Sequence, residues 1–401
     1  MECSGKPVCD RTASDWEKCT EEELLRLTVE APEEAVRKRV LDCWDHVAKP
    51  LDGLGRFETL TAQIGAIQGT EHIDICQKAV LIMCADHGIV EEGVSQSPAE
   101  VTRMVAAQMG KQSSSVGKMA SKAGADTIPV DIGMKGGPIP GVLDRKVRPG
   151  TGNFRRGCAM TREEAVRAVC VGIAMAKECR DAGYRILATG EMGIGNTTAS
   201  SAVAAALLGC SAEEVTGRGA GLDDARLLHK KRVIEEALEY HGLLQDAHAL
   251  SQEEISRPEL SRAGLSLPEE RSGREYALRV LSCVGGLDIA GLAGVCIGGA
   301  LYRLPVVLDG VISMTAALLA QRLAPGVSDF LLPSHMGREP AAEKLADALA
   351  LNPVIHAQMA LGEGTGAVMM LSLLDIALCV YQKQLTFSDM GLERYERFDQ
   401  S

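Results

Sequence analysis

Residues 185–200 read RILATGEMGIGNTTAS, and this stretch passes from an apolar run through a glycine-rich turn into a segment of small residues. The apolar run predicts a buried strand, and the small residues predict a helix. Gly190, Gly193 and Gly195 lack a Cβ, so the backbone of the turn can close around a ligand. The unpaired N–H groups and the positive end of the following helix would attract an anion such as a phosphate.

The same stretch has other interpretations. An ordinary tight connection between a strand and a helix also uses glycines, and Asn196, Thr197 and Thr198 could simply cap the helix. A Walker loop needs a lysine where Asn196 stands. A dinucleotide fingerprint spaces its glycines as G-x-G-x-x-G, whereas this chain has G-x-x-G-x-G. The turn therefore fits neither of these two nucleotide motifs.

Apolar runs that predict buried parallel strands recur along the chain and alternate with helix-length segments, at residues 79–84, 127–130, 185–188, 305–308 and 330–332. The chain has 46% hydrophobic residues, 42 glycines and only 3% aromatics, so its core must be aliphatic and its elements must approach closely. We therefore expect an α/β fold with a doubly wound, mostly parallel sheet, helices on both faces and a smaller helical unit.

Four of these runs end with an acidic residue that is next to a glycine or two residues before one, namely Asp86, Asp131, Glu191 and Asp309. In an open α/β sheet the ligand binds beyond the carboxyl ends of the strands, so these four acids could line one crevice. Alternatively, each acid could simply cap the helix that follows it. The recurrence of the pattern favours the crevice.

Composition limits the possible partners. The formal net charge is −12 and no basic run is present, which argues against nucleic acid as a partner. Thirteen cysteines without a CxxC pair, together with a polar N-terminus, predict reduced thiols in a cytoplasmic protein. Neither the cysteines nor the eight histidines show the local spacing of a zinc site, so we expect no metal site. Residues 284–301 could span a membrane by length, but six glycines and Asp288 favour a buried helix, so we expect no membrane partner.

The chain divides into three parts. Residues 20–48 have apolar positions at helical spacing and are followed by Pro50 and Gly53, so residues 1–50 are expected to supply an N-terminal helical segment of the smaller unit. Residues 51–350 are expected to form the nucleotide- and base-binding α/β domain, with a polar surface excursion at 241–276. Residues 351–401 would supply a glutamate loop and C-terminal helices.

A second glycine-rich turn lies in ALGEGTGAVMMLSLLDIAL, residues 360–378, where Glu363 stands between Gly362 and Gly364 just before an apolar helix. A carboxylate in such apolar surroundings is poorly solvated, which raises its pKa and makes it a better proton acceptor near neutral pH. The alternative is that Glu363 only caps the helix.

Eight segments together closely resemble the nicotinate-nucleotide:dimethylbenzimidazole phosphoribosyltransferase family. They occur in the family's order, as GRFETLTAQIGAIQG (55–69), ADHGIVEEGVSQSPAEVT (85–102), ATGEMGIGNTT (188–198), TGRGAGLDD (216–224), GGLDIAGLAG (285–294), LDGVISMTAALLA (308–320), LPSHMGRE (332–339) and LGEGTGA (361–367). Each segment is only moderately specific, but their collinear order is a strong signal.

The resemblance implies a displacement at the anomeric carbon of nicotinate mononucleotide. A nitrogen of 5,6-dimethylbenzimidazole would replace nicotinate with inversion from β to α, giving α-ribazole 5′-phosphate for the lower ligand of cobalamin. By similarity Glu363 is the base that takes the azole proton, and Glu191 is a second acid of the active site. The resemblance implies a homodimer and small-molecule substrates. Because the donor carries only a monophosphate, it implies no metal and no cofactor.

We assign the remaining site residues from the turn chemistry and the resemblance together. The phosphate and ribose are expected at Gly193, Ile194, Gly195, Asn196, Asp309 and Gly362, and the base at Ser97, Leu361 and Asp86. The chain departs from many relatives at Gly337, Ala360, Val311 and Val105, so other benzimidazoles, adenine or phenols are alternative acceptors. A non-catalytic nucleotide-binding or sensing protein is the alternative function. A dehydrogenase would need a dinucleotide fingerprint.

Overall fold

A computed structural model describes residues 11–243 and 273–397 of the chain. Its centre is a six-stranded sheet in the order β3-β2-β1-β4-β5-β6, and every neighbouring pair of strands is parallel. The strands are β1 (Lys78–Ala85), β2 (Ala125–Gly133), β3 (Leu143–Asp144), β4 (Ile186–Met192), β5 (Val306–Leu308) and β6 (Leu331–Pro333). The predicted doubly wound parallel sheet is confirmed, and only the short, exposed β3, which has no apolar run, was not predicted.

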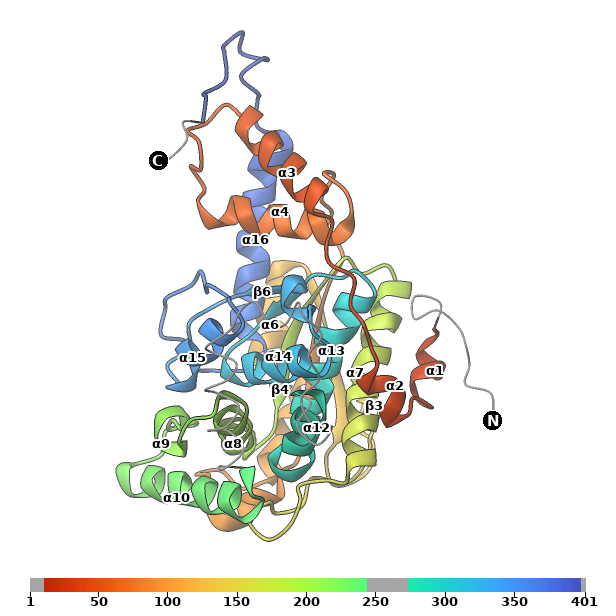
Figure 1. Cartoon of the computed structure of the whole chain (residues 1–401), viewed down its shortest axis with the longest axis vertical. Coiled ribbons are helices and arrows are strands. Elements are labelled where there is room, and N and C mark those ends of the chain that lie inside the picture. Colours follow the sequence, from red (N-terminus) through yellow and green to blue (C-terminus); the bar gives the residue numbers. More distant parts are fainter. Residues whose placement is uncertain (1–10, 244–272, 398–401) are drawn as a thin grey trace.

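Helices cover both faces of this sheet (Figure 1). They are α1 (Ala13–Trp16), α2 (Glu21–Leu25), α3 (Glu34–His46), α4 (Arg56–Gln68), η2 (Gly88–Glu92), α5 (Glu100–Gly110), α6 (Ser115–Ala123), α7 (Arg162–Asp181), α8 (Asn196–Leu208), α9 (Ala212–Val215), α10 (Asp224–Tyr240), α12 (Gly273–Val284), α13 (Leu287–Leu301), α14 (Val311–Leu323), η5 (Val327–Phe330), α15 (Ala341–Ala348) and α16 (Thr365–Lys383). Of the predicted polar excursion at 241–276, residues 244–272 lie outside the described part of the chain.

The alternation of side chains along β1 creates two cores. Leu81 and Met83 point into a core shared with α7 and α13, whereas Val80 and Ile82 point into a core shared with α6 and α16. Because successive side chains of a strand face opposite sides of the sheet, a strand buried on both faces must be apolar throughout. All eight residues of β1 are buried, which explains why the run KAVLIMCA predicts this strand so clearly.

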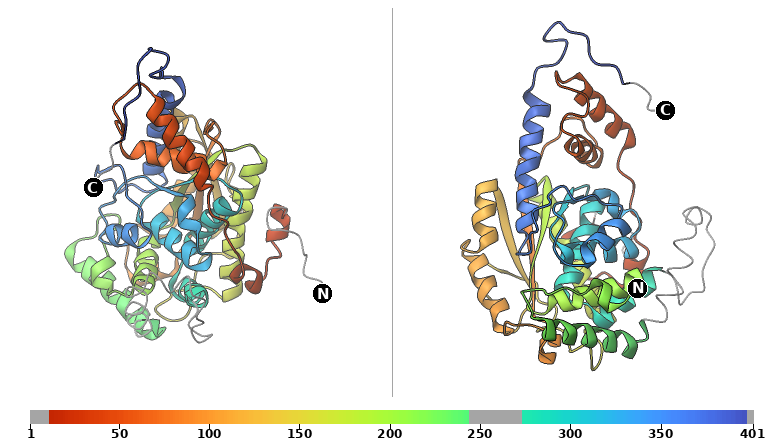
Figure 2. Two further views of the ribbon diagram at one scale, coloured as in Figure 1. Left: turned by 45° about the horizontal axis from the view of Figure 1, so that its top comes forward. Right: turned by 90° about the vertical axis from the view of Figure 1, so that its left-hand side faces the viewer.

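The apolar run at 284–301 forms the end of α12 and the buried helix α13. Its glycines allow close helix packing, because a Cβ on Gly294 would lie only 1.9 Å from the carbonyl oxygen of Val169 in α7. The described helix whose length and hydropathy would suffice for a membrane span is instead α16, and half of its apolar window is buried inside the protein. Figure 2 shows α16 running along the sheet and on into the helical unit.

The smaller helical unit consists of α3, α4 and the C-terminal half of α16 (Figure 1). The indole of Trp44 in α3 donates a hydrogen bond to Thr61 Oγ1 of α4 at 2.9 Å and lies 5.0 Å from the Tyr381 ring of α16. The unit therefore includes α4, which lies beyond the predicted boundary at residue 50, and excludes α1 and α2, which pack against α7. The expected continuous helical pattern at 20–48 is broken between α2 and α3, where Pro32 restricts the preceding residue to extended backbone.

Candidate functional site

A cavity of about 290 Å³ opens beyond the carboxyl ends of β4 and β5. This is where a doubly wound sheet places its ligand, and the volume lies near the lower end of the range for small-molecule sites. Eight of the eleven predicted site residues line the cavity, namely Glu191, Gly193, Ile194, Asn196, Asp309, Leu361, Gly362 and Glu363. Gly195, Ser97 and Asp86 are outside this lining.

Glu363 is held in an unusual backbone conformation at the mouth of α16. Gly362, Glu363 and Gly364 have φ angles of +80°, +63° and +100°, so three consecutive residues are left-handed. A non-glycine residue in this region carries strain of about 1 kcal/mol or more, and such strain clusters at functional sites. The loop passes so close to β4 that a Cβ on Gly190 would lie 2.4 Å from the Glu363 carbonyl oxygen. Gly190 is therefore required for packing this loop.

The Glu363 side chain is half-buried in the cavity. Burial raises the pKa of its carboxyl group, and the negative charge of Asp309 raises it further, although a hydrogen bond from the Val116 N–H at 3.3 Å opposes this effect. The sequence likewise predicts a raised pKa for Glu363. A carboxylate with a raised pKa that still reaches a cavity can accept a proton from a bound ligand.

Asp309 holds the glutamate loop in place. Its carboxylate accepts hydrogen bonds from the backbone N–H groups of Gly364, Gly366 and Ala367, at 3.2, 2.8 and 3.2 Å. These are N–H groups at the start of α16, which have no partner within the helix. The carboxylate therefore caps α16 and fixes the position of Glu363, so Asp309 faces the cavity with its oxygens already engaged.

Glu191 belongs to a buried polar network beneath the cavity. The Asn196 side-chain amide donates hydrogen bonds to Glu191 and, at 3.2 Å, to Asp288, and Asp288 also pairs with His87 at 3.1 Å. Burial raises the pKa of Glu191 to about 8, and the nearby charge of Asp288 adds to this effect. Glu191 is therefore protonated at neutral pH and can donate a hydrogen bond to a ligand.

The fully buried imidazole of His87 is held in this network by its bond to Asp288. Burial alone would lower the pKa of His87, but the carboxylates of Asp288, Asp86 and Glu191 outweigh burial and raise it. Asp288 lies two residues after a glycine pair in the apolar run 284–301, where its charge argues only against a membrane span. An acid within an apolar run is the available signal, and the fold shows Asp288 buried at the start of α13.

The helices α8 and α14 present their N-termini to the cavity, and they differ in how many of their first backbone N–H groups are already hydrogen-bonded. In the predicted phosphate turn, Thr102 Oγ1 already accepts from the Ile194 N–H at 3.0 Å, and the Asn196 N–H donates to the Gly193 carbonyl at 3.0 Å. Both helices have a glycine N-cap without a side-chain hydrogen bond, but at α14 the N–H groups of Val311, Ile312 and Ser313 have no hydrogen-bond partner among the described residues. Gly310 through Ser313 line the cavity. The first turn of α14 is therefore well placed to bind an anion.

Lys230 is a functional candidate that the sequence analysis missed. This fully buried side chain of α10 donates hydrogen bonds to Thr197 Oγ1 at 3.0 Å and to the Gly217 carbonyl at 3.2 Å. Burial lowers the pKa of Lys230 to about 8, although the negative charge of Glu339 opposes this effect. Within residues 11–243 and 273–397 no carboxylate lies within 4.0 Å of this ammonium group, yet Thr197 lines the cavity. Lys230 occupies the buried stripe with Val233, Ile234 and Ala237, and a lysine in an apolar stripe was the available signal.

The other two strand-end acids, Asp86 and Asp131, bind groups of the protein's own backbone and do not line the cavity. Asp86 is buried and accepts a hydrogen bond from the Lys135 N–H at 2.7 Å, while Asp131 accepts from Met134 N–H and pairs with Lys146. The expected crevice of four strand-end acids therefore contains only Glu191 and Asp309. The other two acids fix the loop after β2, because each satisfies backbone donors there.

Gly195 is the N-cap of α8 with a φ of +98°. A Cβ at this position would lie 2.8 Å from the Val90 side chain. Ser97 is half-buried in the loop before α5, and its backbone N–H is bound by Ser95 Oγ at 3.2 Å. On the same side of the cavity, the lining residue that α5 supplies is the apolar Val105.

Comparisons with known proteins agree on one family. The model of a phosphoribosyltransferase family matches residues 29–392. The chain is 40% identical over 366 residues to the nicotinate-nucleotide–dimethylbenzimidazole phosphoribosyltransferase of Acetivibrio thermocellus, covering 91% of this chain and 95% of that protein. It is 41% identical over 350 residues to the protein of that name from Chloroflexus aggregans, covering 87% and 91%. The crystal structure of CobT from Thermus thermophilus matches with a TM-score of 0.77 and 36% identity, covering 90% of this chain and all of that chain.

Proposed function

This chain belongs to the nicotinate-nucleotide:dimethylbenzimidazole phosphoribosyltransferase family, and from this membership we propose how the cavity carries out the family's reaction. The enzyme transfers the phosphoribosyl group of nicotinate mononucleotide to 5,6-dimethylbenzimidazole, which releases nicotinate and gives α-ribazole 5′-phosphate for the lower ligand of a cobamide. The alternative of a non-catalytic binding protein is not favoured, since the match covers nearly the whole length of catalytic relatives.

Glu363 is the base in this proposal. One azole nitrogen attacks the anomeric carbon, a new C–N bond forms, and the bond to the nicotinate nitrogen breaks with its electron pair remaining on nicotinate. The proton on the other azole nitrogen passes to the Glu363 carboxylate, so the product azole is neutral. The observation that carries the assignment is the location of Glu363, on a strained loop in the cavity with a raised pKa.

We place the phosphate of the mononucleotide at the first turn of α14 and near Lys230. The first N–H groups of α14 have no hydrogen-bond partner among the described residues. Lys230 is a buried cation that no described carboxylate contacts directly, although the charge of Glu339 acts on it from a longer distance. A phosphate would compensate this charge, since a buried cation is costly unless it is paired. Gly193 and Gly219 also line the cavity, so the predicted glycine turn still borders the site. A monophosphate needs no divalent metal to neutralise it, and none is included in the transfer.

Glu191 is assigned to orient the ligand. Because its pKa is raised to about 8, it is a protonated carboxyl group near neutral pH and can donate a hydrogen bond to a ribose hydroxyl or to the incoming base. Val105 and Leu361 supply apolar surface for the base. This surface suits a methylated benzimidazole and other flat aromatic acceptors.

We further propose that the enzyme is a cytoplasmic homodimer that binds neither nucleic acid nor a membrane. Exposed apolar side chains support a second copy as the partner. Met369 and Ile376 of α16 are 44% and 66% exposed and lie seven residues apart, hence on one face of the helix, and Leu361 just before α16 is 56% exposed. The acidic net charge of −12 argues against a nucleic-acid partner.

The decisive experiment measures nicotinate release with and without an added azole. The wild-type protein should release nicotinate only when a benzimidazole is present. Glu363→Gln should lower the rate by about 10²- to 10⁴-fold, the usual contribution of general base catalysis, while still binding nicotinate mononucleotide. Glu343→Gln changes an exposed acid of α15 and should keep the wild-type rate. Full activity of Glu363→Gln would remove Glu363 from its role, and binding without turnover against a panel of bases would support the non-catalytic alternative.

A further inference from the structure

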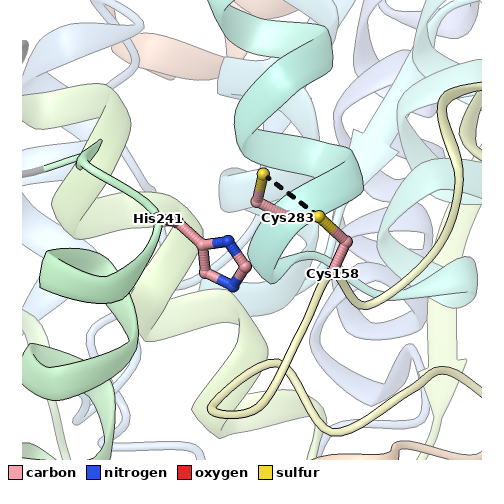
Figure 3. A group of neighbouring side chains, drawn as sticks. All are labelled: Cys158, His241 and Cys283. Carbon is pink, nitrogen blue, oxygen red and sulfur yellow. Dashed lines mark hydrogen bonds between the residues drawn. The ribbon is translucent and has the colours of Figure 1, made fainter.

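Two thiols and an imidazole meet outside the substrate cavity. Cys158 lies in the loop between β3 and α7, His241 directly follows α10, and Cys283 lies near the end of α12. One potential ligand atom from each residue lies within 4.8 Å of the other two, and the two sulfur atoms are 3.7 Å apart. Figure 3 shows the histidine ring facing the pair of sulfurs. None of the three residues lines the cavity.

The surrounding fold fixes each of these side chains. The Ala159 and Met160 N–H groups donate to the carbonyls of Cys283 and Ser282 at 2.9 and 3.0 Å, so the loop is tied to α12 beside both thiols. Arg279 of α12 donates to the His241 carbonyl at 2.8 Å, which ties the end of α10 to the same helix. The cluster is therefore held together by bonds that do not involve the thiols or the imidazole.

The histidine is also oriented as metal-ligating histidines are. Its Nε2 lies 2.8 Å from the Phe154 carbonyl oxygen, which is an acceptor, so Nε2 carries the proton. The other ring nitrogen, Nδ1, is then left with a free lone pair. In Figure 3 this nitrogen is the one on the side of the sulfurs. A backbone carbonyl that fixes the tautomer in this way is the usual outer partner of a metal-bound histidine.

We propose that Cys158, His241 and Cys283 bind one Zn²⁺ ion through their two Sγ atoms and Nδ1. Zinc lies about 2.3 Å from thiolate sulfur, so two sulfurs of a tetrahedral site are separated by about 3.7 Å. The sulfur pair already has this separation. Binding replaces the two thiol protons, which are released to solvent, and the two thiolates balance the charge of the ion. Among residues 11–243 and 273–397 no fourth ligand joins the group, and Cys158 is exposed, so the fourth position is open to water.

A disulfide is the competing outcome for this sulfur pair. It would shorten the separation to about 2.05 Å and would give the imidazole no role. The ion, by contrast, uses all three side chains. It would clamp the loop that carries Asn153 and Arg155, both of which bind Glu92 of η2, to α10 and α12. The role is thus structural and is independent of the transfer chemistry. Local spacing could not reveal such a site, because its ligands come from three distant segments.

Zinc binding to the full-length protein tests the proposal. After reduction and chelator treatment under exclusion of air, the protein should take up about one equivalent of Zn²⁺, and Co²⁺ in its place should give a thiolate-to-metal charge-transfer band. Cys158→Ser and His241→Gln should each weaken Zn²⁺ binding at least about tenfold, because even the loss of an outer-shell partner costs about ten- to a hundredfold. The melting temperature of the wild-type protein should rise with Zn²⁺ concentration.

Matched controls keep the outcome interpretable. His229→Gln changes a histidine within α10 whose Nε2 also contacts a backbone carbonyl, and Cys76→Ser changes another exposed cysteine. Both should bind Zn²⁺ as the wild-type protein does. The proposal is wrong if the reduced wild-type protein takes up no equivalent, or if Cys158→Ser and His241→Gln bind as tightly as these controls. It is equally wrong if intact-mass measurement finds a Cys158–Cys283 disulfide and the reduced protein still binds no ion.

Discussion

Replacing Glu191 by glutamine should flatten the pH dependence of stability. The pKa of this buried carboxyl is raised from 4.5 to about 8, so the folded protein keeps a proton that the unfolded chain loses above pH 4.5. The folded state therefore loses stability relative to the unfolded state as pH rises from about 4.5 to about 8. At about 1.36 kcal/mol per pH unit, this gap corresponds to a loss of about 5 kcal/mol. Glutamine cannot ionise, but its oxygen can still accept from Asn196.

The free energy of unfolding should be measured by denaturant titration at several pH values between about 5 and 8.5, for the wild-type protein and Glu191→Gln. The difference between the two curves reports Glu191 together with its electrostatic coupling to His87, while groups remote from Glu191 titrate alike in both proteins. We expect the variant to gain stability relative to wild type across this range, by several kcal/mol at its upper end. Glu17→Gln, which changes an exposed acid, should follow the wild-type curve. Parallel curves for wild type and Glu191→Gln would show that the pKa of Glu191 is not raised in the folded protein.

Three further predictions address the phosphate site, the loop and the dimer. Lys230→Met should weaken the binding of nicotinate mononucleotide, measured by calorimetry, about ten- to a hundredfold, since a charged hydrogen bond contributes about 1.5–3 kcal/mol. Lys231→Met should bind the mononucleotide as wild type does, and equal affinities of the two variants would mean that the phosphate does not bind near Lys230. Asp309→Ala should lower the free energy of unfolding by about 2–3 kcal/mol and also lower kcat, because three N–H groups of α16 lose their acceptor. Asp309→Asn should give intermediate values, and a wild-type kcat in Asp309→Ala would argue against the positioning role. Ile376→Lys should dissociate the dimer in light-scattering measurements while Leu385→Lys does not, and an intact Ile376→Lys dimer would exclude this face of α16 as the interface.

Much of the fold follows from local sequence patterns. Strands β1 and β5 and the first three residues of β4 are buried on both faces, so they form apolar runs that are visible without knowledge of their partners. The glycine turns at 190–195 and 362–364 are equally visible, because left-handed backbone and close approach require glycine. Glu363 itself is an exception to this rule, since it adopts a positive φ without being glycine.

The partners of individual side chains could not be predicted in the same way. Asp309 stands beside a glycine at a strand end, as Glu191 does, but it is occupied by the N-terminus of a helix more than fifty residues later. Lys230 was missed because its burial depends on how α10 packs against α8. Cys158 and Cys283 are far apart in sequence and meet only in the fold. In all three cases the partner of the side chain is brought close by packing between distant segments, so it cannot be seen in any one segment of the sequence.

The most direct measurement of the central claim is a crystal structure of this protein with 5,6-dimethylbenzimidazole bound. We expect one Glu363 carboxylate oxygen at about 2.6–3.2 Å from a ring nitrogen, or joined to it through a single water molecule. A ring bound in the cavity with the Glu363 carboxylate turned away from it, and with no bridging water, would contradict the assignment of Glu363 as the base.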